Sequence, residues 1–485
     1  RAPATARFTA AVTTENVPSS RTPATAGDPS DRGRLREAAG GPEGPNGSSE
    51  MFLGTTAAGS GSKQAMKSSR AQLLVPLAAV VLAAACSSSH SGARSTTTTA
   101  VATPSTTSTS TTNGSATTTS PTSTTVSAGA ALPTGFTVFD LTWISTDEGW
   151  ALGVAPCTKP PCTSVAHTLD GGKTWAGLPA PKAYSFSDPP AIPADPPCIA
   201  TVPCIQAMRF ADAKNGYAYG ATSLWLTTNG GHTWTQKSSD ATATLEIAHG
   251  TVVRVTPADS GCPPGCNYVI EAAAVGSTTW HTLAAPKLIG DGAAVALEGS
   301  NIYVAGFGHT AGGAADAHTQ MIRSTDGGAH WATFADPCGV SPSGNEADAT
   351  AITAAPGGAL AVGCTPRAPG EAAFVVLSAD AGATFGPHRG GLLPAVPAGG
   401  ERIENIAAAT GQRLAVLVSG ENLSIAVSND AGGDWTVTHT DTPANGVGRW
   451  FIGFQDSLTG RAILVPRTIL TTTDGGGHWT GYTFG

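Results

Sequence analysis

The sequence predicts an all-β protein built from a repeated unit, and three observations support this prediction. An octapeptide with the pattern Ser/Thr-x-Asp-x-Gly-x-x-Trp occurs three times, at Thr168–Trp175, Ser324–Trp331 and Thr472–Trp479. Looser copies occupy Thr227–Trp234, Ser378–Phe385 and Ser428–Trp435. Only 12% of the residues are charged, and the chain contains 60 Gly and 35 Pro. This composition is typical of loop-rich β structure rather than of a helical bundle.

The chemistry of the octapeptide is that of a tight turn between two strands. The Asp and the Ser/Thr side chains can hydrogen-bond to nearby backbone groups and so close the turn locally. Glycine at the fifth position permits a backbone conformation that a Cβ atom would penalise. The final Trp begins the next strand, where its large ring can be buried while its N–H still finds a partner.

The aromatic residue that ends each octapeptide predicts the number of units. These anchors are Trp175, Trp234, Trp331, Phe385, Trp435 and Trp479. The gap from Trp234 to Trp331 is too long for one unit, and Trp280 fills it as the anchor of a degenerate copy that has lost its Asp. The spacings then become 59, 46, 51, 54, 50 and 44 residues. A period of this size with several short strands per unit predicts a seven-bladed β-propeller of four-stranded antiparallel blades.

The octapeptide resembles the Asp-box, or BNR repeat, of sialidase-type β-propellers. In that family the residues of the box are structural, which implies the same role here and argues against catalysis by them. They are Asp170, Asn229, Asp326, Asp380, Asp430 and Asp474, with the anchors Trp175, Trp234, Trp331, Phe385, Trp435 and Trp479. A strand and an acidic-Gly turn precede the box at Phe136–Val154, Phe210–Gly220 and Phe454–Gly460. This fuller unit resembles the repeat of the photosystem II assembly/stability factor family of propellers, and the resemblance covers nearly all of residues 132–485.

The residues before 132 are expected to form separate segments. Residues 1–65 lack hydrophobic periodicity and do not begin with Met; they are either a disordered tail or, as we prefer, sequence upstream of a true start at Met66 or Met51. Residues 66–86 pair a basic start with the apolar run Ala71–Ala85, which is short for a membrane span and typical of a secretory signal. Residues 87–131 are Ser/Thr-rich and are expected to form a solvated tether.

The end of the signal segment suggests lipidation. Leu82–Cys86 resembles a bacterial lipobox, which implies a lipid on Cys86 and a head anchored outside the cytoplasmic membrane of a bacterial cell. An ordinary signal peptide or an uncleaved anchor is the alternative. Up to Cys86 the chain has 9 of its 26 basic and 6 of its 34 acidic residues, which leaves 17 basic and 28 acidic residues and a net charge of −11. Because nucleic-acid binding requires a cationic surface, this class of partner is excluded.

Eight cysteines remain when Cys86 is set aside, and an even number in an exported protein favours disulfides. Local pairing suggests Cys157–Cys162, Cys198–Cys204, Cys262–Cys266 and Cys338–Cys364. The clustered Cys-x2-Cys pairs of zinc sites are absent, and no metal is predicted. All eight fall in loops on the face opposite the octapeptide turns. We expect binding at these cross-linked loops; the alternative is that long exported loops need cross-links for stability alone.

Charged residues in the same loops are candidates for the binding face. They are Arg367, Glu371, Arg402, Glu404, Asp316 and His309. The arginines could receive an anionic ligand, and the alternative, which we favour, is ion pairing with Glu371, Glu401 or Glu404. His309, Asp316 and His318 have a spacing that could suit a metal, but a Gly/Ala-rich loop of this kind is more often unliganded.

Because the octapeptide resembles that of sialidases, the sequence must also be compared with a sialidase active site. The resemblance would bring three arginines, a Tyr nucleophile with a Glu, an Asp acid/base, six blades and a Phe/Tyr-Arg-Ile-Pro motif. That motif is absent, and the nearest sequence is Val465–Arg467. Paired carboxylates could also hydrolyse glycosides, and acids occur on the predicted loop face. These are Asp316, Glu346, Asp348, Glu371, Glu401 and Glu404, for which surface solvation is the favoured explanation.

The sequence therefore favours a non-enzymatic binding or assembly module for a protein or glycan at the cell surface, with a monomeric head, a lipid anchor and no cofactor. The alternative is a sialidase-like glycoside hydrolase. Because one fold hosts both functions, the residues at the mouth of the central channel must decide between them. An enzyme predicts two carboxylates, or a Tyr–Glu pair with clustered arginines, at that place.

Overall fold

The computed structural model describes residues 130–185, 202–259, 265–308, 319–368, 370–386, 402–442 and 450–485. All regular elements in these ranges are β-strands. No helix among them is long and apolar enough to cross a membrane. The predicted signal segment with Cys86 and the predicted tether up to residue 129 lie outside the described residues, so both stay predictions.

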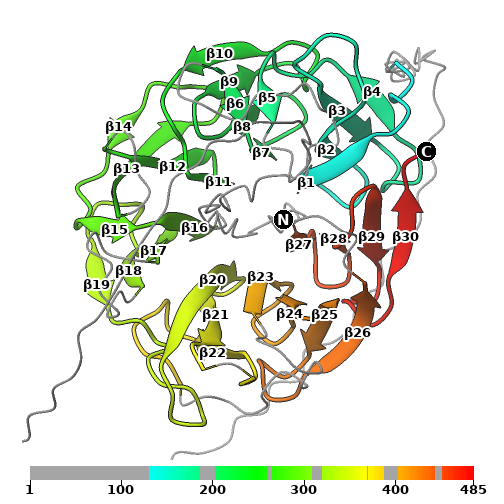
Figure 1. The fold of residues 1–485 in the computed structure, drawn as a ribbon. Helices are drawn as coiled ribbons and strands as arrows, with labels where there is room; N and C mark the ends of the chain where they lie inside the picture. Colours follow the sequence, from blue (N-terminus) through cyan, green and yellow to red (C-terminus); the bar gives the residue numbers. More distant parts are fainter. Residues whose placement is uncertain are drawn as a thin grey trace, which may run out of the picture. The chain divides into compact units, whose positions relative to one another are not determined.

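The described residues form a seven-bladed β-propeller, as the repeat period predicted (Figure 1). Blade 1 contains β1 (Thr137–Trp143), β2 (Gly149–Val154), β3 (Thr163–Thr168) and β4 (Ala176–Leu178). Blade 2 contains β7 (Ala207–Phe210), β8 (Gly216–Tyr219), β9 (Leu224–Thr227) and β10 (Thr235–Ser238). Blade 3 contains β11 (Thr244–Ala248), β12 (Thr251–Pro257), β13 (Cys266–Ala274), β14 (His281–Thr282) and β15 (Leu288–Gly290). Blade 4 contains β16 (Gly292–Glu298), β17 (Asn301–Phe307), β18 (Gln320–Ser324) and β19 (Ala332–Phe334).

The remaining blades follow the same order. Blade 5 contains β20 (Ala347–Ala355), β21 (Ala359–Pro366) and β22 (Phe374–Ser378). Blade 6 contains β23 (Arg402–Ala408), β24 (Leu414–Ser419), β25 (Leu423–Ser428) and β26 (Thr436–Asp441). Blade 7 contains β27 (Phe451–Phe454), β28 (Gly460–Ile463), β29 (Thr468–Thr472) and β30 (Thr480–Thr483). A short parallel pair, β5 (Tyr184–Ser185) and β6 (Cys204–Ile205), flanks the connection from blade 1 to blade 2.

Each blade is an antiparallel meander that leads from an inner strand outward, with each octapeptide following the third strand. The prediction that Trp280 anchors a degenerate copy is confirmed, because β14 begins at the next residue. In blade 3, β13 pairs with β14 along one part and with β15 along another. The fourth strand predicted after Phe385 would begin next to residues 387–401, outside the described ranges.

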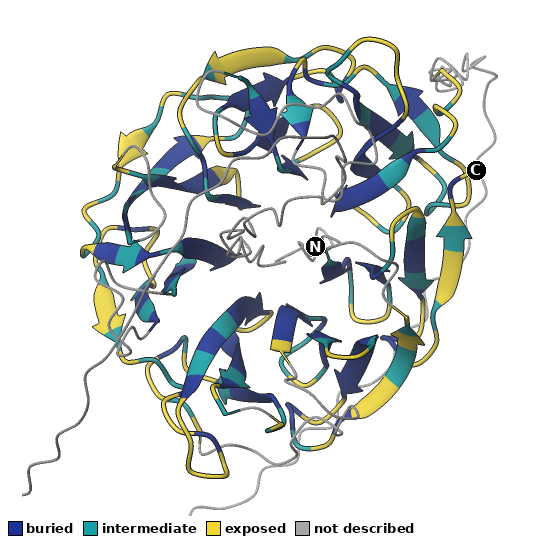
Figure 2. Ribbon diagram, in the orientation of Figure 1, coloured by how far each residue is buried: buried dark blue, intermediate teal, exposed yellow. Residues whose placement is uncertain are grey.

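The hydrophobic core is divided among the seven blade interfaces. Seven clusters of buried apolar side chains occur among the described residues, and each combines residues from two neighbouring blades. Burial is greatest on the inner strands, while β10 and β26 on the outside are largely exposed (Figure 2). A single blade could not bury two apolar faces by itself, so the ring is the smallest unit that satisfies all of them.

All six octapeptides form the same hydrogen-bonded turn. The hydroxyl of the first residue donates to the carboxylate or amide oxygen of the third at 2.7–3.0 Å. The same hydroxyl accepts the N–H of the fifth residue at 2.8–3.0 Å. The third residue accepts the N–H of the seventh at 2.8–3.0 Å. The structural role predicted for these residues therefore has a direct geometric basis.

The fourth octapeptide residue adopts the left-handed conformation as well as the fifth. Its φ lies between 56° and 78° in all six turns, and that of the fifth glycine between 76° and 96°. The sequence argument predicted this only for the fifth position. At the fourth position two turns carry alanine instead of glycine, Ala381 (φ 56°) and Ala431 (φ 61°). A Cβ is unfavourable there, so these two turns are strained.

The fourth residue also connects elements that are distant in the sequence. Its N–H donates to a carbonyl of the turn between the first two strands of its own blade, as from Gly171 to Asp147 at 2.9 Å. Its carbonyl accepts a side chain from the preceding blade in three cases. Trp150 Nε1 donates to Gly230 at 3.1 Å, Arg461 Nη2 donates to Gly171 at 3.1 Å, and Arg323 Nη1 donates to Ala381.

The degenerate turn of blade 3 lacks the Asp and is held by a side chain of blade 2. The Tyr217 hydroxyl donates to the Ser277 carbonyl at 3.0 Å and accepts the N–H of Gly276 at 2.8 Å. Tyr217 lies near the start of β8 in blade 2. Trp150 occupies the equivalent position of β2 in blade 1, from which it donates to Gly230 of the next blade. A side chain of the preceding blade thus compensates for the missing Asp.

Replacement of Ala381 by Gly is expected to stabilise the ring. Relief of the left-handed strain, less the added entropy of the unfolded chain, amounts to about 0.5–1 kcal/mol. Chemical denaturation of A381G and wild type measures the difference. The control is A383G, because exposed Ala383 lies in the same turn without a positive φ. Equal or lower stability of A381G would contradict the strain argument.

The turn aspartates are expected to make stability acid-sensitive. Hydrogen bonds from the Thr384 side chain and backbone, and from Ser378, hold the pKa of Asp380 below its ordinary value of 3.8. A folded-state pKa below the unfolded value gives a stabilisation that is complete above the ordinary pKa and is lost as the pH falls below it.

D380N should preserve this turn at neutral pH, because in blade 2 the Asn229 oxygen accepts the Thr227 hydroxyl and the Thr233 N–H, and its amide group donates to the Thr233 hydroxyl. Thermal unfolding at neutral pH and in steps below about pH 4 should show a shallower loss of Tm for D380N than for wild type. D380A is the control and should be less stable at every pH. Parallel curves for D380N and wild type would disprove the assignment.

Candidate functional site

The ends of the sheets opposite the octapeptide turns form the loop face, which comprises the turns between second and third strands and the blade-to-blade connections. Two disulfides fix it. Cys157–Cys162 closes the β2–β3 loop, and Cys338–Cys364 ties the connection before β20 to β21, each with a Cα–Cα distance of 5.5 Å. Both pairings were predicted and are confirmed. Cys204 and Cys266 are also disulfide-bonded, and their predicted partners, Cys198 and Cys262, lie outside the described residues.

One loop of this face is held by a disulfide and several hydrogen bonds, and we refer to its residues 338–346 as the blade 5 hairpin. Val340 and Glu346 form its bridge. Across the tip, the Ser341 N–H donates to the Asn345 carbonyl at 2.7 Å, and the Gly344 N–H donates to the Ser341 carbonyl at 2.9 Å. The residues from Pro342 to Glu346 are exposed, and Val340 retains 54% of its accessible surface.

Two of the candidate binding residues are clamps of this hairpin. The Glu371 carboxylate accepts the Ser341 hydroxyl at 2.9 Å and the Asn345 amide. Arg367 forms a two-point ion pair with Asp348, at 2.8 Å from Nε and from Nη2, and a further bond to Glu346 at 3.0 Å. The ion-pairing alternative therefore describes Arg367, and its acidic partners among the described residues are Glu346 and Asp348.

The other candidates lie elsewhere. Arg402 and Glu404 lie on the inner strand of blade 6, 3.6 Å apart between Nε and Oε2, and Glu404 also accepts the Ser419 hydroxyl at 2.5 Å. Burial raises the pKa of Glu404, while Arg402 lowers it. His309, Asp316 and Glu401 lie outside the described residues. Among the described residues, no three His, Cys, Asp or Glu side chains gather in a metal-binding arrangement.

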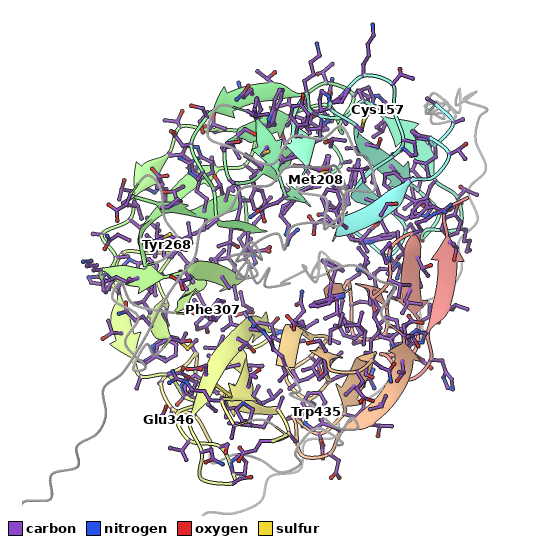
Figure 3. The ribbon with its side chains drawn as sticks, in the orientation of Figure 1. Cys157, Met208, Tyr268, Phe307, Glu346 and Trp435 are labelled. Carbon is purple, nitrogen blue, oxygen red and sulfur yellow. A yellow bond between two sulfur atoms is a disulfide. The ribbon has the colours of Figure 1, made fainter. Side chains whose placement is uncertain are left out.

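A second cluster, on the inner strands of blades 1, 2 and 3, was not predicted. Arg209 of β7 lies between two carboxylates, Asp140 of β1 and Glu246 of β11. Its Nη1 is 3.1 Å from Asp140 Oδ2 and its Nε is 2.9 Å from Glu246 Oε1. The side chains are only 3–5% exposed. Met208, whose N–H donates to Asp140 at 2.6 Å, lies on the inner side of the ring, whereas Glu346 lies toward its outside (Figure 3).

The two carboxylates of this inner-strand cluster differ in their hydrogen-bond donors. Asp140 accepts a backbone N–H besides Arg209, while Glu246 accepts the Arg209 Nε–H. Burial raises the pKa of Glu246 to about 7 against the lowering effect of Arg209. Burial likewise raises the pKa of Tyr219, whose hydroxyl donates to the Leu245 carbonyl at 3.2 Å. One sequence signal existed, namely a charged residue within each of three otherwise apolar inner strands, TVFDLTW, AMRF and TLEIA.

The comparisons with known proteins find likeness in solved structures only. No protein-family model matches, and no curated protein matches. The structure of YCF48 bound to D1 peptide shares 16% identity over 72% of this chain and 97% of that one, with a TM-score of 0.41. The Niastella koreensis GH74 enzyme shares 13% identity over 71% and 65%, with a TM-score of 0.31. A PL25 ulvan lyase shares 9% over 74% and 94%, with a TM-score of 0.42. The likeness is one of propeller fold alone.

The inner-strand cluster and the blade 5 hairpin are suited to different chemistry. The inner-strand cluster does bring two carboxylates together, which is the arrangement expected of an enzyme. However, each is engaged by Arg209 and is almost completely buried, whereas hydrolysis requires an acid and a base that reach a substrate. The blade 5 hairpin carries exposed polar and apolar groups on a loop that a disulfide and side-chain hydrogen bonds hold in place, which favours recognition of another molecule.

Removal of the Glu371 clamp is expected to loosen the hairpin without unfolding the ring. In E371A the tip loses two hydrogen bonds, so exchange of the Ser341, Gly344 and Asn345 amides with deuterium should accelerate about tenfold or more. Tm should remain close to that of wild type. E421A, which removes an exposed carboxylate from the β24–β25 turn, is the control. Unchanged exchange in E371A would show that the clamp is unimportant.

Proposed function

We propose that the propeller is a non-enzymatic binding module that docks a protein partner through its loop face. The observation that carries the proposal is the blade 5 hairpin, which a disulfide, the Glu371 carboxylate and the Arg367 ion pairs hold in place while its tip stays exposed. A loop that is ordered before binding loses little conformational entropy in a complex. Its exposed groups include Val340 and polar side chains, a mixture that suits a protein surface.

We further propose that the module acts outside the cytoplasm on a lipid anchor. The support is in the sequence: a secretory-type apolar run, Cys86 in a lipobox-like context, and a Ser/Thr-rich tether of residues 87–131. Disulfides in the head are consistent with an oxidising compartment. In this arrangement the tether holds the head away from the membrane so that a partner can reach the loop face.

Site-specific photocrosslinking tests the docking face. A benzophenone amino acid is placed at Val340 on the loop face and, for comparison, at Leu458 and Leu169 on the opposite face; all three are exposed apolar positions. In the cells that produce the protein, irradiation should yield a discrete protein adduct from position 340 that is absent from positions 458 and 169. The membrane fraction should contain this adduct, and C86A should release it.

Two outcomes would overturn the proposal. Adducts from positions 458 and 169 but none from 340 would assign binding to the octapeptide face. An adduct from 340 that persists unchanged when E371A loosens the hairpin would show that hairpin order is irrelevant to recognition.

A further inference from the structure

The inner-strand cluster has a property that goes beyond partner binding, because its two carboxylates share one guanidinium unequally. Asp140 receives the Arg209 Nη1–H on both oxygens, at 3.1 and 3.2 Å, and the Met208 N–H at 2.6 Å. Glu246 receives the Arg209 Nε–H at 2.9 Å. The charged form of Asp140 is therefore better stabilised than that of Glu246. A proton that enters the cluster goes to Glu246.

The charged and titratable groups around Glu246 come from β1, β7, β8, β12 and β16. Arg209 comes from β7, Tyr219 from β8 and Asp140 from β1. From β12, Arg254 is engaged by Glu271 at 2.7 Å. From β16 the charged residue is Glu298 at its end, which accepts the Asn301 amide at 3.3 Å. Arg209 is thus the cation that the structure places on Glu246.

We propose that Asp140, Arg209 and Glu246 form a proton-responsive connection between blades 1, 2 and 3. Uptake of one proton from solvent by Glu246 converts its ion pair with Arg209 into a contact between a neutral carboxyl group and the guanidinium, while the ion pair of Arg209 with Asp140 is kept. The link between blades 1 and 2 is retained, because Phe210 N–H also donates to the Thr142 hydroxyl at 3.0 Å. The change is therefore directed to the inner-strand link between blades 2 and 3.

The direction in which stability changes with pH follows from the difference between the folded and unfolded pKa of Glu246. Burial raises the pKa of Glu246 from 4.5 to about 7, so between these values the folded protein holds a proton that the unfolded chain does not. Stability therefore rises as the pH falls through 7, in contrast to the effect of the turn aspartates below their ordinary pKa.

Two measurements on the full chain test the proposal. In wild type, Tm should rise between about pH 8 and about pH 5.5, and the Arg209 Nε–H NMR signal should titrate with a midpoint of about 7. In E246Q the amide oxygen can still accept from Arg209, but both the Tm rise and the titration should be lost. The matched control is E271Q, since Glu271 faces Arg254 as a single carboxylate on a single guanidinium in the same blade. E271Q should retain both effects.

The outcomes are distinct. A constant Arg209 signal over this pH range in wild type would overturn the proposal, and that measurement does not depend on any variant folding. A Tm rise that persists in E246Q, or that disappears in E271Q, would also overturn it. None of these three results bears on docking at the loop face, which is tested separately.

Discussion

The left-handed fourth residue of the octapeptide is the constraint on which the ring most depends. Its N–H is fixed by the inner turn of its own blade, and in blades 1, 2 and 5 its carbonyl accepts a side chain from the preceding blade. The N–H of this residue is thus bonded within its own blade, and in those three blades its carbonyl is bonded to the preceding blade. It therefore converts a local turn into a joint between sheets. Blade 3 confirms the importance of the joint, because Tyr217 restores it where the Asp is missing.

The joint matters most where the ring closes between blade 7 and blade 1, whose strands are far apart in the sequence. Arg461 donates to the carbonyls of Thr146 and Gly171 at 3.1 Å, and its guanidinium lies 4.2 Å from the Trp143 ring centroid. Burial lowers the pKa of this arginine to about 10, so it remains charged at neutral pH. Gly135 N–H to Gly485 carbonyl, at 2.8 Å, and the edge contact of Phe136 with Phe484 complete the closure.

Local chemistry explains what could be predicted from the sequence. The turn needs a hydroxyl, an acceptor and a glycine at fixed offsets, so six copies and the period between their anchors were enough to predict seven blades. Two cysteine pairs were also predictable, because Cys157–Cys162 is a local pair and Cys338–Cys364 spans a single blade. The left-handed fourth residue was missed, because alanine at positions 381 and 431 conceals the conformation that glycine signals elsewhere.

The candidate sites were predictable only in part, for reasons of distance along the chain. The loop face followed from strand order, and Arg367 and Glu371 do lie there, but their partners in the blade 5 hairpin depend on how two loops meet. Arg209 is 69 residues from Asp140 and 37 from Glu246. No pattern within one repeat relates residues so far apart. These three inner strands lie side by side only in the folded ring. The sequence alone therefore shows one charged residue in each strand and does not show that the three residues meet.

The two kinds of carboxylate in this protein respond to acid in opposite directions, and this follows from where each lies. The turn aspartates are near the surface, and donors surround them, so hydrogen bonding dominates and lowers the pKa of Asp326, Asp380 and Asp474. Glu246 is buried with one guanidinium shared between two acids, so desolvation dominates and raises its pKa. As the pH falls, the ring is expected first to gain stability through Glu246 and then to lose it through its turn aspartates. For these two groups of carboxylates together, the stabilisation is expected to be greatest in mild acid, between the ordinary pKa of an aspartate and the raised pKa of Glu246.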